Sequence, residues 1–380
     1  MMAAMVALQE LRVLHVVSSE TFAGIERHVL SLTRELRALG CAAELACLPN
    51  ATRLREEACA AGIPLLPSGR FRSRLWIPAL ARNVADDPPD VVHVHDGRAA
   101  VAGALLTYVA DAVLLRAQHF THPASVTRSG LSRCLSLALH RTLNRQLDGY
   151  VAVSRAAAEA ARQRRETGRS EVTVIPPAVD LPPAEAIARA REQRAGLRGP
   201  VVVFAGRFEA ERCLDVLLHA IPRVREQLPD CRFVLAGSGA AENDLRSVAV
   251  RLGVENAITW TGWVTDTYSV LGPAHVYVNT WPHEGFGMAM AEGMALGLPV
   301  VAVDAGASVE LVDPGVTGLL VPPADPAALA AAIVGVIGDT EVLARMSRAA
   351  SERALSLYGA ARTARETLAL YQRMVERKRT

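Results

Sequence analysis

The sequence predicts an α/β protein built from two doubly wound domains, and three observations lead to this prediction. Short runs rich in β-branched residues alternate with longer helical segments along the whole chain. Runs such as Val201–Ala205 and Val300–Val303 are continuously apolar, which is typical of parallel strands covered by helices on both faces. The chain of 380 residues is also longer than one compact domain usually is, so two domains are expected.

The expected strands divide between the two halves of the chain. The first half holds Val13–Ser18, Ala42–Leu48, Val91–His95, Val113–Gln118, Gly149–Val153 and Val172–Ile175. The second half holds Val201–Ala205, Arg232–Ala236, Ile258–Thr261, Val276–Asn279, Val300–Val303 and Gly318–Val321. Helices are expected between most of these strands, for example over Arg27–Leu39 and over Leu131–Leu147, where apolar residues recur at helical spacing.

The boundary between the domains is expected near residues 175–200. There Pro176, Pro177, Pro182 and Pro183 interrupt the chain, and a short charged helix over 184–194 follows them. We therefore assign residues 1–178 to the first domain and 179–358 to the second. The remaining residues, 359–380, form an expected helix with Leu368, Tyr371 and Val375 roughly in line. This helix follows the last strand of the second sheet and is free to return to the first domain.

The composition excludes several classes of function. A net charge of +2 gives no sign of a nucleic-acid partner. The only lysine is Lys378, so a Schiff-base lysine for pyridoxal phosphate and a Walker-type lysine for ATP are both excluded. The six cysteines include no C-x-x-C pair, and we interpret them as reduced thiols of a cytoplasmic protein. The N-terminus is not a convincing signal peptide, and Asp111 interrupts the longest apolar stretch, which we expect to be a buried helix and strand.

The segment 281–302, WPHEGFGMAMAEGMALGLPVVA, carries the most functional information. It follows an expected strand, and Gly285, Phe286 and Gly287 lead into an expected helix that begins near Met288. The backbone N–H groups at a helix start can hold a phosphate, and the two glycines let a ligand approach the backbone closely. This part of the segment therefore predicts a phosphate site.

Two glutamates complete the pattern. Glu292 lies about one turn inside the expected helix, where its carboxylate can accept hydrogen bonds from the two vicinal hydroxyls of a ribose. Glu284 lies in the loop and can reach hydroxyls of a sugar beyond the phosphates. One nucleotide-sugar thus accounts for both carboxylates, although a glutamate near a helix start and a solvated loop glutamate also occur for purely structural reasons.

The spacing E-G-F-G-x-x-x-x-E followed by G-x-P-V-V-A resembles the signature of the retaining glycosyltransferases of family 4, which have the GT-B fold. Further landmarks of that family recur in the same order, at Ala23–Glu26, Asp90–His95, Val151–Ser154, Val174–Asp180, Phe204–Leu218 and Ala305–Glu310. The resemblance implies two Rossmann-like domains that face each other across a cleft. Residues 1–178 would form the acceptor side, and residues 179–358 would bind the nucleotide-sugar.

The resemblance also implies roles for two arginines at the donor diphosphate. By position they are Arg207 and Arg212, and Arg212 and Cys213 stand where the family usually has Lys and Gly. Arginine keeps the charge and can bind phosphate in a bidentate fork. We expect Arg207, which directly follows a strand and a glycine, to be the better-ordered of the two cations.

Four other residues match the family by position. Gly24 would approach the donor from the first domain, and His119 corresponds to the first-domain histidine that faces the transferred sugar. Trp263 and Val264 match the loop that flanks the nucleobase, although Trp263 could equally be a core residue. A lone histidine at a strand end also has a common structural explanation.

We expect no metal ion and no other cofactor. The sequence contains no D-x-D motif, which holds a divalent metal in the other large transferase fold, so arginines and helix-start amides would neutralise the diphosphate instead. His93 and His95 share one strand face, but with no third ligand evident we expect no metal site there. The resemblance implies transfer with retention of configuration, and a front-face route fits because no carboxylate clearly matches a nucleophile.

The substrates stay open at this point. A UDP-sugar is the first candidate donor and GDP-mannose the second, and the acceptor is a sugar, a lipid-linked molecule or a small molecule. A nucleotide-sugar 2-epimerase and a non-catalytic nucleotide-sugar-binding subunit are the alternatives. Arg70, Arg72 and Arg74 lie just before Trp76, which suits either a solvated loop or peripheral contact with an anionic inner membrane face.

Overall fold

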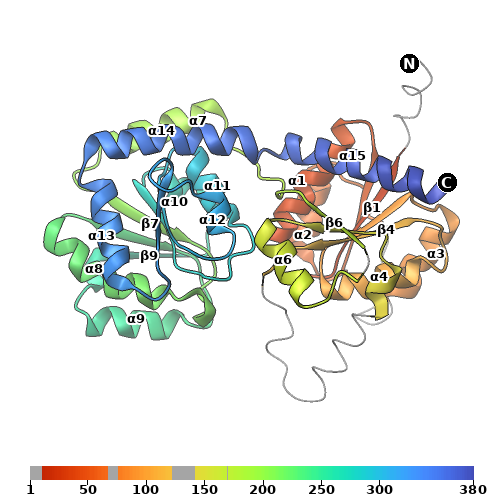
Figure 1. The fold of residues 1–380 in the computed structure, drawn as a ribbon, viewed down its shortest axis with the longest axis horizontal. Helices are drawn as coiled ribbons and strands as arrows, with labels where there is room; N and C mark the ends of the chain where they lie inside the picture. The colour runs from red at the N-terminus through yellow and green to blue at the C-terminus, as the bar shows by residue number, and fades with distance from the viewer. Residues whose placement is uncertain (1–10, 67–75, 122–141, 169) are drawn as a thin grey trace. The chain divides into compact units, whose positions relative to one another are not determined.

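A computed structural model describes residues 11–66, 76–121, 142–168 and 170–380. The chain divides into two compact units, shown in Figure 1. Unit 1 comprises residues 1–179 together with 360–380, and unit 2 comprises residues 180–359. The cluster Arg70–Arg74 and most of the helix expected over residues 131–147 lie outside the described residues.

Unit 1 is built on a parallel sheet with the strand order β2-β1-β3-β4-β5-β6. The strands are β1 (Arg12–Val17), β2 (Ala42–Cys47), β3 (Val91–Val94), β4 (Val113–Gln118), β5 (Gly149–Ala152) and β6 (Glu171–Val174). The described helices are α1 (Gly24–Ala38), α2 (Thr52–Ala60), α3 (Trp76–Asp86), α4 (Gly97–Leu106), α6 (Arg155–Gln163), α15 (Ala360–Arg379) and the 3-10 turn η3 (Asn144–Gln146).

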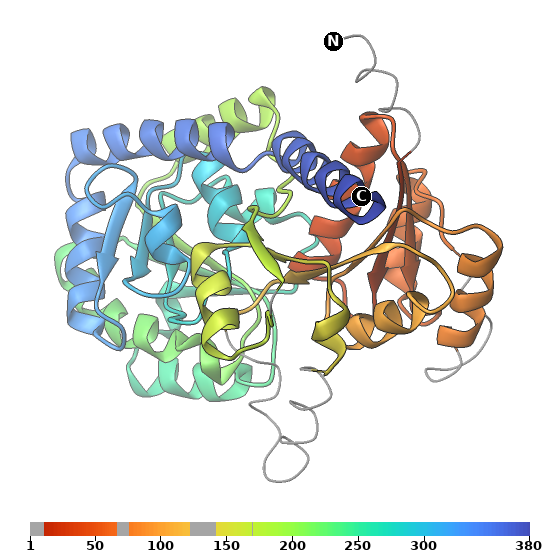
Figure 2. The ribbon, with the colours of Figure 1, turned by 45° about the vertical axis from the view of Figure 1, so that its right-hand side comes forward.

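The C-terminal helix α15 completes one face of this sheet. It packs beside α1, as Figures 1 and 2 both show, and it buries Tyr371 and Met374 against the strands. Gly149 opens β5 directly beneath it, where a Cβ atom would lie 2.6 Å from Met374 Cε. The other face is covered by helices that include α2 and α4 and encloses a second apolar core. Unit 1 is therefore finished only by the last helix of the chain.

Unit 2 repeats the architecture with the strand order β12-β11-β10-β7-β8-β9, again all parallel. Its strands are β7 (Val201–Ala205), β8 (Arg232–Ala236), β9 (Ile258–Gly262), β10 (Val276–Asn279), β11 (Val300–Val303) and β12 (Gly318–Val321). Its helices are α7 (Ala184–Ala195), α8 (Leu214–Gln227), α9 (Glu242–Arg251), α10 (Thr267–Leu271), α11 (Met288–Ala295), α12 (Ser308–Leu311), α13 (Pro326–Ile337), α14 (Thr340–Leu357) and the turns η4 (Ala210–Arg212) and η5 (Glu255–Ala257).

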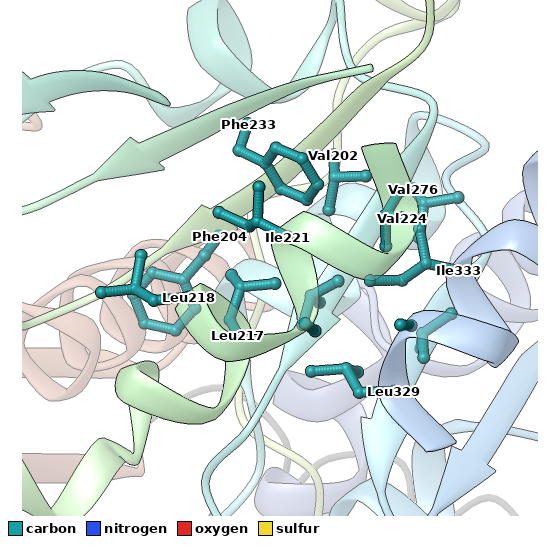
Figure 3. Packing of buried hydrophobic residues seen from close by; sticks show 14 of the residues in the cluster. Val202, Phe204, Leu217, Leu218, Ile221, Val224, Phe233, Val276, Leu329 and Ile333 are labelled. Atoms are coloured by element: carbon teal, nitrogen blue, oxygen red, sulfur yellow. The ribbon is translucent and has the colours of Figure 1, made fainter. Parts of the chain in front are cut away.

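The core of unit 2 shows why these runs form a parallel sheet. Helix α8 presents Leu217 and Ile221 to Phe204 and Phe233 of the neighbouring strands, while α13 adds Ile333 from the side (Figure 3). All five side chains are fully buried. Burial of one such side chain is worth roughly 1.5–3 kcal/mol, so the continuous apolar strands are stabilised by helices on their faces. The prediction of two doubly wound parallel sheets is confirmed.

Among the described helices, no single one is long and apolar enough to cross a membrane. The pair α13 and α14 reaches the required length and composition only together, and the two helices meet at a 94° bend. Core helices of globular domains pass the same test, and α13 contributes four fully or nearly fully buried apolar residues to the core of unit 2: Leu329, Ala330, Ile333 and Val336.

Candidate active site

The strand orders place the candidate residues. In unit 2 the order reverses between β7 and β10, because the chain builds outward from β7 through β8 to β9 and then returns to β10 on the other side. In doubly wound sheets, ligands bind at the carboxyl ends of the strands at such a reversal. The loops that leave β7 and β10 carry Arg207, Arg212 and Glu284. The topology therefore brings two predicted segments to one edge, although they lie more than seventy residues apart.

Arg212 is the best-anchored cation at this edge. It ends the turn η4, and its backbone carbonyl accepts a hydrogen bond of 2.7 Å from the Thr280 hydroxyl. Its Nη1 donates to Glu284 Oε2 at 3.3 Å, and its guanidinium lies 4.0 Å from the ring centre of Trp281. Its Nε is buried and has no hydrogen-bond partner among the described residues. Arg212 is thus held in place, and its Nε–H group is still able to donate a hydrogen bond to a ligand.

Glu284 faces Arg212 from the loop after β10. Backbone N–H groups of Gly285 and Phe286 also hydrogen-bond to it. Burial raises the pKa of Glu284, while Arg212 and the two backbone donors oppose the rise. The side chain is 11% exposed, against 16% for Arg212, so the pair is largely removed from water. A carboxylate and a guanidinium in this setting form a strong polar site for a hydroxylated anionic ligand.

The structure corrects the expected ranking of the two arginines. The side chain of Arg207 is 45% exposed, and its nearest recorded ion-pair partner, Glu211, lies at 4.0 Å, the outer limit for an ion pair. The expectation that Arg207 is the better-ordered cation is therefore wrong. Its position directly after β7 fixes the backbone, but the side chain projects from the edge into solvent, whereas Arg212 is clamped by Trp281 and Glu284.

The predicted helix start after Glu284 is present. Gly287 precedes α11 with φ +94°, a conformation that a residue with a Cβ rarely adopts, and a Cβ here would also lie 2.5 Å from Met290 Cε. Helix α11 begins at Met288, and the N–H groups of its first turn have no partner within the helix. Phe286 is buried and packs edge-to-face on Tyr358, and this contact anchors the loop between β10 and α11.

Glu292 lies inside α11 and is fully buried. Its Oε2 accepts a hydrogen bond of 2.7 Å from the hydroxyl of Thr267, the first residue of α10. The hydroxyl of Thr267 thus occupies one of the hydrogen-bonding positions on Glu292 that a ribose hydroxyl is expected to take. Trp263 and Val264 follow the edge strand β9, and Trp263 is 46% exposed, so the core alternative for this residue is wrong.

Unit 1 has its own strand-order reversal, between β1 and β3. Gly24 is the first residue of α1, in the segment that follows β1, and His119 directly follows β4. Asp96 accepts hydrogen bonds from the Ser18 backbone at 2.6 Å and from Arg98 and Ala99 at the start of α4. Burial lowers the pKa of His119 to about 4, although Asp96 acts in the opposite direction. His119 therefore carries a neutral imidazole at pH 7.

His119 belongs to a cluster of five histidines that we call the histidine cluster: His15, His28, His93, His95 and His119. The premise that no third metal-binding side chain is available beside His93 and His95 is wrong, because His15 on β1 pairs in register with His93 on β3. Sequence reasoning missed this because strand register is a long-range property. It also missed Trp281 and Thr267, whose contacts with Arg212 and Glu292 leave no pattern in the local sequence.

Comparisons with known proteins agree with this geometry. Residues 22–182 match the family model described as Glycosyltransferase Family 4, and residues 199–339 match the model described as Glycosyl transferases group 1. The chain is 30% identical over 344 residues to the phosphatidyl-myo-inositol mannosyltransferase of Mycolicibacterium smegmatis, which covers 87% of this chain and 85% of the relative. It is also 30% identical over 273 residues to the glycogen synthase of Mycobacterium tuberculosis, covering 70% of this chain and 65% of the relative.

Solved structures show the same fold. The Anabaena protein HepE in complex with UDP and glucose superposes with a TM-score of 0.80 at 21% identity, covering 95% of this chain and 99% of the other. Sucrose-phosphate synthase from Thermosynechococcus elongatus superposes with a TM-score of 0.77 at 20% identity, covering 96% and 99%. The GT-B assignment of the fold is therefore confirmed.

Proposed function

Because the chain belongs to the family 4 glycosyltransferases, we propose that it transfers a hexose-type sugar from a nucleotide-sugar to a hydroxyl acceptor, with retention of configuration and without a metal ion. The observation that carries the proposal is the cluster of Arg212, Glu284 and Trp281 at the carboxyl ends of β7 and β10. It combines a fixed cation, a carboxylate and a helix start at one edge of the sheet, which are the groups that a nucleotide-sugar requires.

Each group has a role in this proposal. Arg212, Arg207 and the first-turn amides of α11 stabilise the diphosphate as it leaves, because preorganised donors around developing charge lower the barrier. Glu284 accepts hydrogen bonds from the sugar hydroxyls. Glu292 binds the ribose once the Thr267 hydroxyl is displaced from its carboxylate. The leaving phosphate accepts the acceptor proton, and attack comes from the face that it leaves.

The two glutamates provide the test. We expect Glu292→Ala to weaken donor binding and Glu284→Ala mainly to lower kcat, each by tenfold or more, since a hydrogen bond to a charged group is worth about 1.5–3 kcal/mol. Donor affinity is measured by calorimetry and turnover by release of the nucleoside diphosphate. Glu341, an exposed carboxylate in the first turn of α14, supplies the control Glu341→Ala. Wild-type kinetics in both site variants would refute the assignment.

The donor and acceptor are part of the same proposal. A UDP-sugar is the first candidate donor and GDP-mannose the second, and the mannosyltransferase relatives make mannose a sugar to test beside glucose. Incubation with donor alone separates a transferase from a 2-epimerase, which would form a new sugar isomer without any acceptor. The phosphatidyl-myo-inositol named in those relatives makes a lipid-linked acceptor at a membrane surface the first class to test, followed by small-molecule acceptors.

A further inference from the structure

The histidine cluster contains buried ring nitrogens that have no role in the proposed transfer reaction. His15, His93 and His95 are at most 1% exposed, and each offers a ring nitrogen within 4.8 Å of those of the other two. His15 Nε2 and His93 Nε2 have no hydrogen-bond partner among the described residues. Buried ring nitrogens in native proteins are usually satisfied, so the unpartnered His93 Nε2, which an ion held by the three histidines would engage, requires an explanation.

Burial keeps these imidazoles neutral. It lowers the pKa of His15 to about 3 and the pKa values of His93 and His95 well below the ordinary value, with the neighbouring histidines adding to the effect. A neutral imidazole carries one N–H and one lone pair, and the lone pair is the group that binds a metal ion. The cluster is therefore in the protonation state that a metal site needs.

Hydrogen-bond accounting distinguishes the two triads within the histidine cluster. His28 Nδ1 accepts a hydrogen bond of 2.8 Å from the Ala178 backbone N–H, so the proton of the neutral His28 ring lies on Nε2 and its lone pair is occupied. The outer triad of His28, His95 and His119 therefore lacks one ligand. In the inner triad, His93 Nδ1 lies 2.6 Å from the Tyr371 hydroxyl, and His95 Nδ1 lies 3.4 Å from His119 Nε2. Both Nδ1 atoms can donate, which leaves a lone pair on each Nε2. The lone pair of His95 faces His15 Nδ1 at 2.9 Å, a contact between two members of the same triad that a shared ion can replace, whereas the His28 contact is made with the backbone outside its triad.

We propose that His15, His93 and His95 form a binding site for one divalent late transition metal ion, with Zn2+ as the reference ion. Imidazole nitrogens suit such ions, and the second-sphere contact of His93 with Tyr371 matches the way metal-bound histidines are oriented. The ion links β1, the end of β3 and helix α15, so its role is to hold the last helix on unit 1. It takes no part in the transfer reaction.

The ring positions fit this site. Ring centres lie 5.5 Å apart for His15 and His93, 5.2 Å for His15 and His95, and 4.3 Å for His93 and His95. Three imidazoles around a tetrahedral Zn2+ with bonds of about 2.0–2.1 Å would have ring centres roughly 5 Å apart. His15 Nδ1 and His95 Nε2, now 2.9 Å apart, would separate to roughly 3.3 Å as the lone pair of His95 turns to the ion. His119, which is only partly buried, marks the side of entry.

The test uses the full-length chain without a histidine tag, stripped with a chelator and titrated with Zn2+ by calorimetry and with Co2+ by visible absorption. We expect one equivalent to bind with a dissociation constant in the micromolar range or tighter, and Zn2+ to raise the melting temperature. Removing ligands in His15→Ala or His93→Ala is expected to weaken binding by about 100-fold or more. Tyr371→Phe, which removes only the second-sphere hydroxyl, is expected to weaken it by about tenfold.

Two variants serve as matched controls. His28→Gln lies in the outer triad and His219→Gln on the exposed face of α8, and both are expected to bind Zn2+ as the wild type does. If the alanine variants fail to fold, the comparison of Tyr371→Phe with His28→Gln decides the question. The proposal is overturned if the wild type binds no Zn2+ at 100 µM, if binding survives in both alanine variants, or if His28→Gln is the substitution that abolishes it.

Discussion

Acidification should unfold unit 1 selectively, because four of its histidines are buried and neutral. The pKa of His15 is lowered to about 3 by burial, and those of His28, His93 and His95 are lowered well below 6.5 by burial and by one another. The unfolded chain, with ordinary histidines, therefore binds more protons than the native unit between about pH 6.5 and pH 3. Stability is then present above pH 6.5 and is lost as the pH falls.

The size of the loss follows from linkage. Between pH 7.5 and pH 5.5, each histidine that titrates only in the unfolded chain removes roughly 1 kcal/mol, so the four fully buried histidines together remove several kcal/mol, and His119, with its pKa lowered to about 4, adds to the loss. That is comparable to the whole stability of many domains, which is about 5–15 kcal/mol. Unit 2 offers an internal comparison, because burial lowers the pKa of its His275 to about 4 but this residue is only partly buried.

The measurement is urea unfolding at pH 7.5 and pH 5.5, at fixed ionic strength and with chelator present. Hydrogen exchange read by mass spectrometry, corrected for the intrinsic pH dependence of exchange, reports the two units separately. We expect the free energy of unfolding of unit 1 to fall by several kcal/mol more than that of unit 2. The substitution His15→Asn should reduce the pH dependence by roughly a fifth, because five histidines of unit 1 have lowered pKa values. Equal losses in the two units, or an unchanged slope in His15→Asn, would show that the buried histidines do not control acid stability.

Three further results are expected. Arg212→Ala should lower kcat/KM at least tenfold more than Arg207→Ala, because Arg212 is clamped by Trp281 and Glu284 and a charge-assisted hydrogen bond is worth about 1.5–3 kcal/mol; equal losses would contradict this order. Cys213→Gly should raise the free energy of unfolding by up to about 1 kcal/mol, since Cys213 adopts φ +53°, and thermal or urea unfolding that shows no gain would argue against strain at this position. Transfer activity should persist in excess EDTA at temperatures well below melting, whereas a loss restored by magnesium or manganese would rule out the metal-free mechanism.

The architecture was predictable because its signals are local. A buried parallel strand needs a short continuous run of apolar residues, and runs such as Val113–Gln118 and Arg232–Ala236 form strands with the expected bounds. The phosphate segment around Gly287 was predictable for the same reason, since a helix start after a glycine leaves a sequence pattern. The strand ends differ from the expected bounds by at most one residue, as with Val91–His95, where the strand ends at Val94, whereas helix α1 begins at Gly24, three residues before the expected start.

The rest of the site depends on contacts between distant segments. Nothing in the loop 206–213 shows that Arg212 will stack on Trp281, and the ranking of the two arginines was wrong for that reason. Likewise, His15 and His93 become neighbours only through the parallel register of β1 and β3, which no local pattern specifies. Local periodicity therefore predicted the elements, while the order of groups within the site required the tertiary structure.

The return of α15 to unit 1 has a consequence for biosynthesis. Because unit 1 is made of residues 1–179 and 360–380, unit 2 is in effect an insertion within it. During translation, residues 180–359 are complete and contiguous while unit 1 still lacks Tyr371, Met374 and the rest of the helix that covers one face of its sheet. Unit 2 can therefore fold before unit 1 is complete. One face of the unit 1 sheet keeps its apolar surface uncovered until residues 360–380 have been synthesised. A stop codon near residue 359 would spare unit 2 and leave unit 1 permanently unfinished.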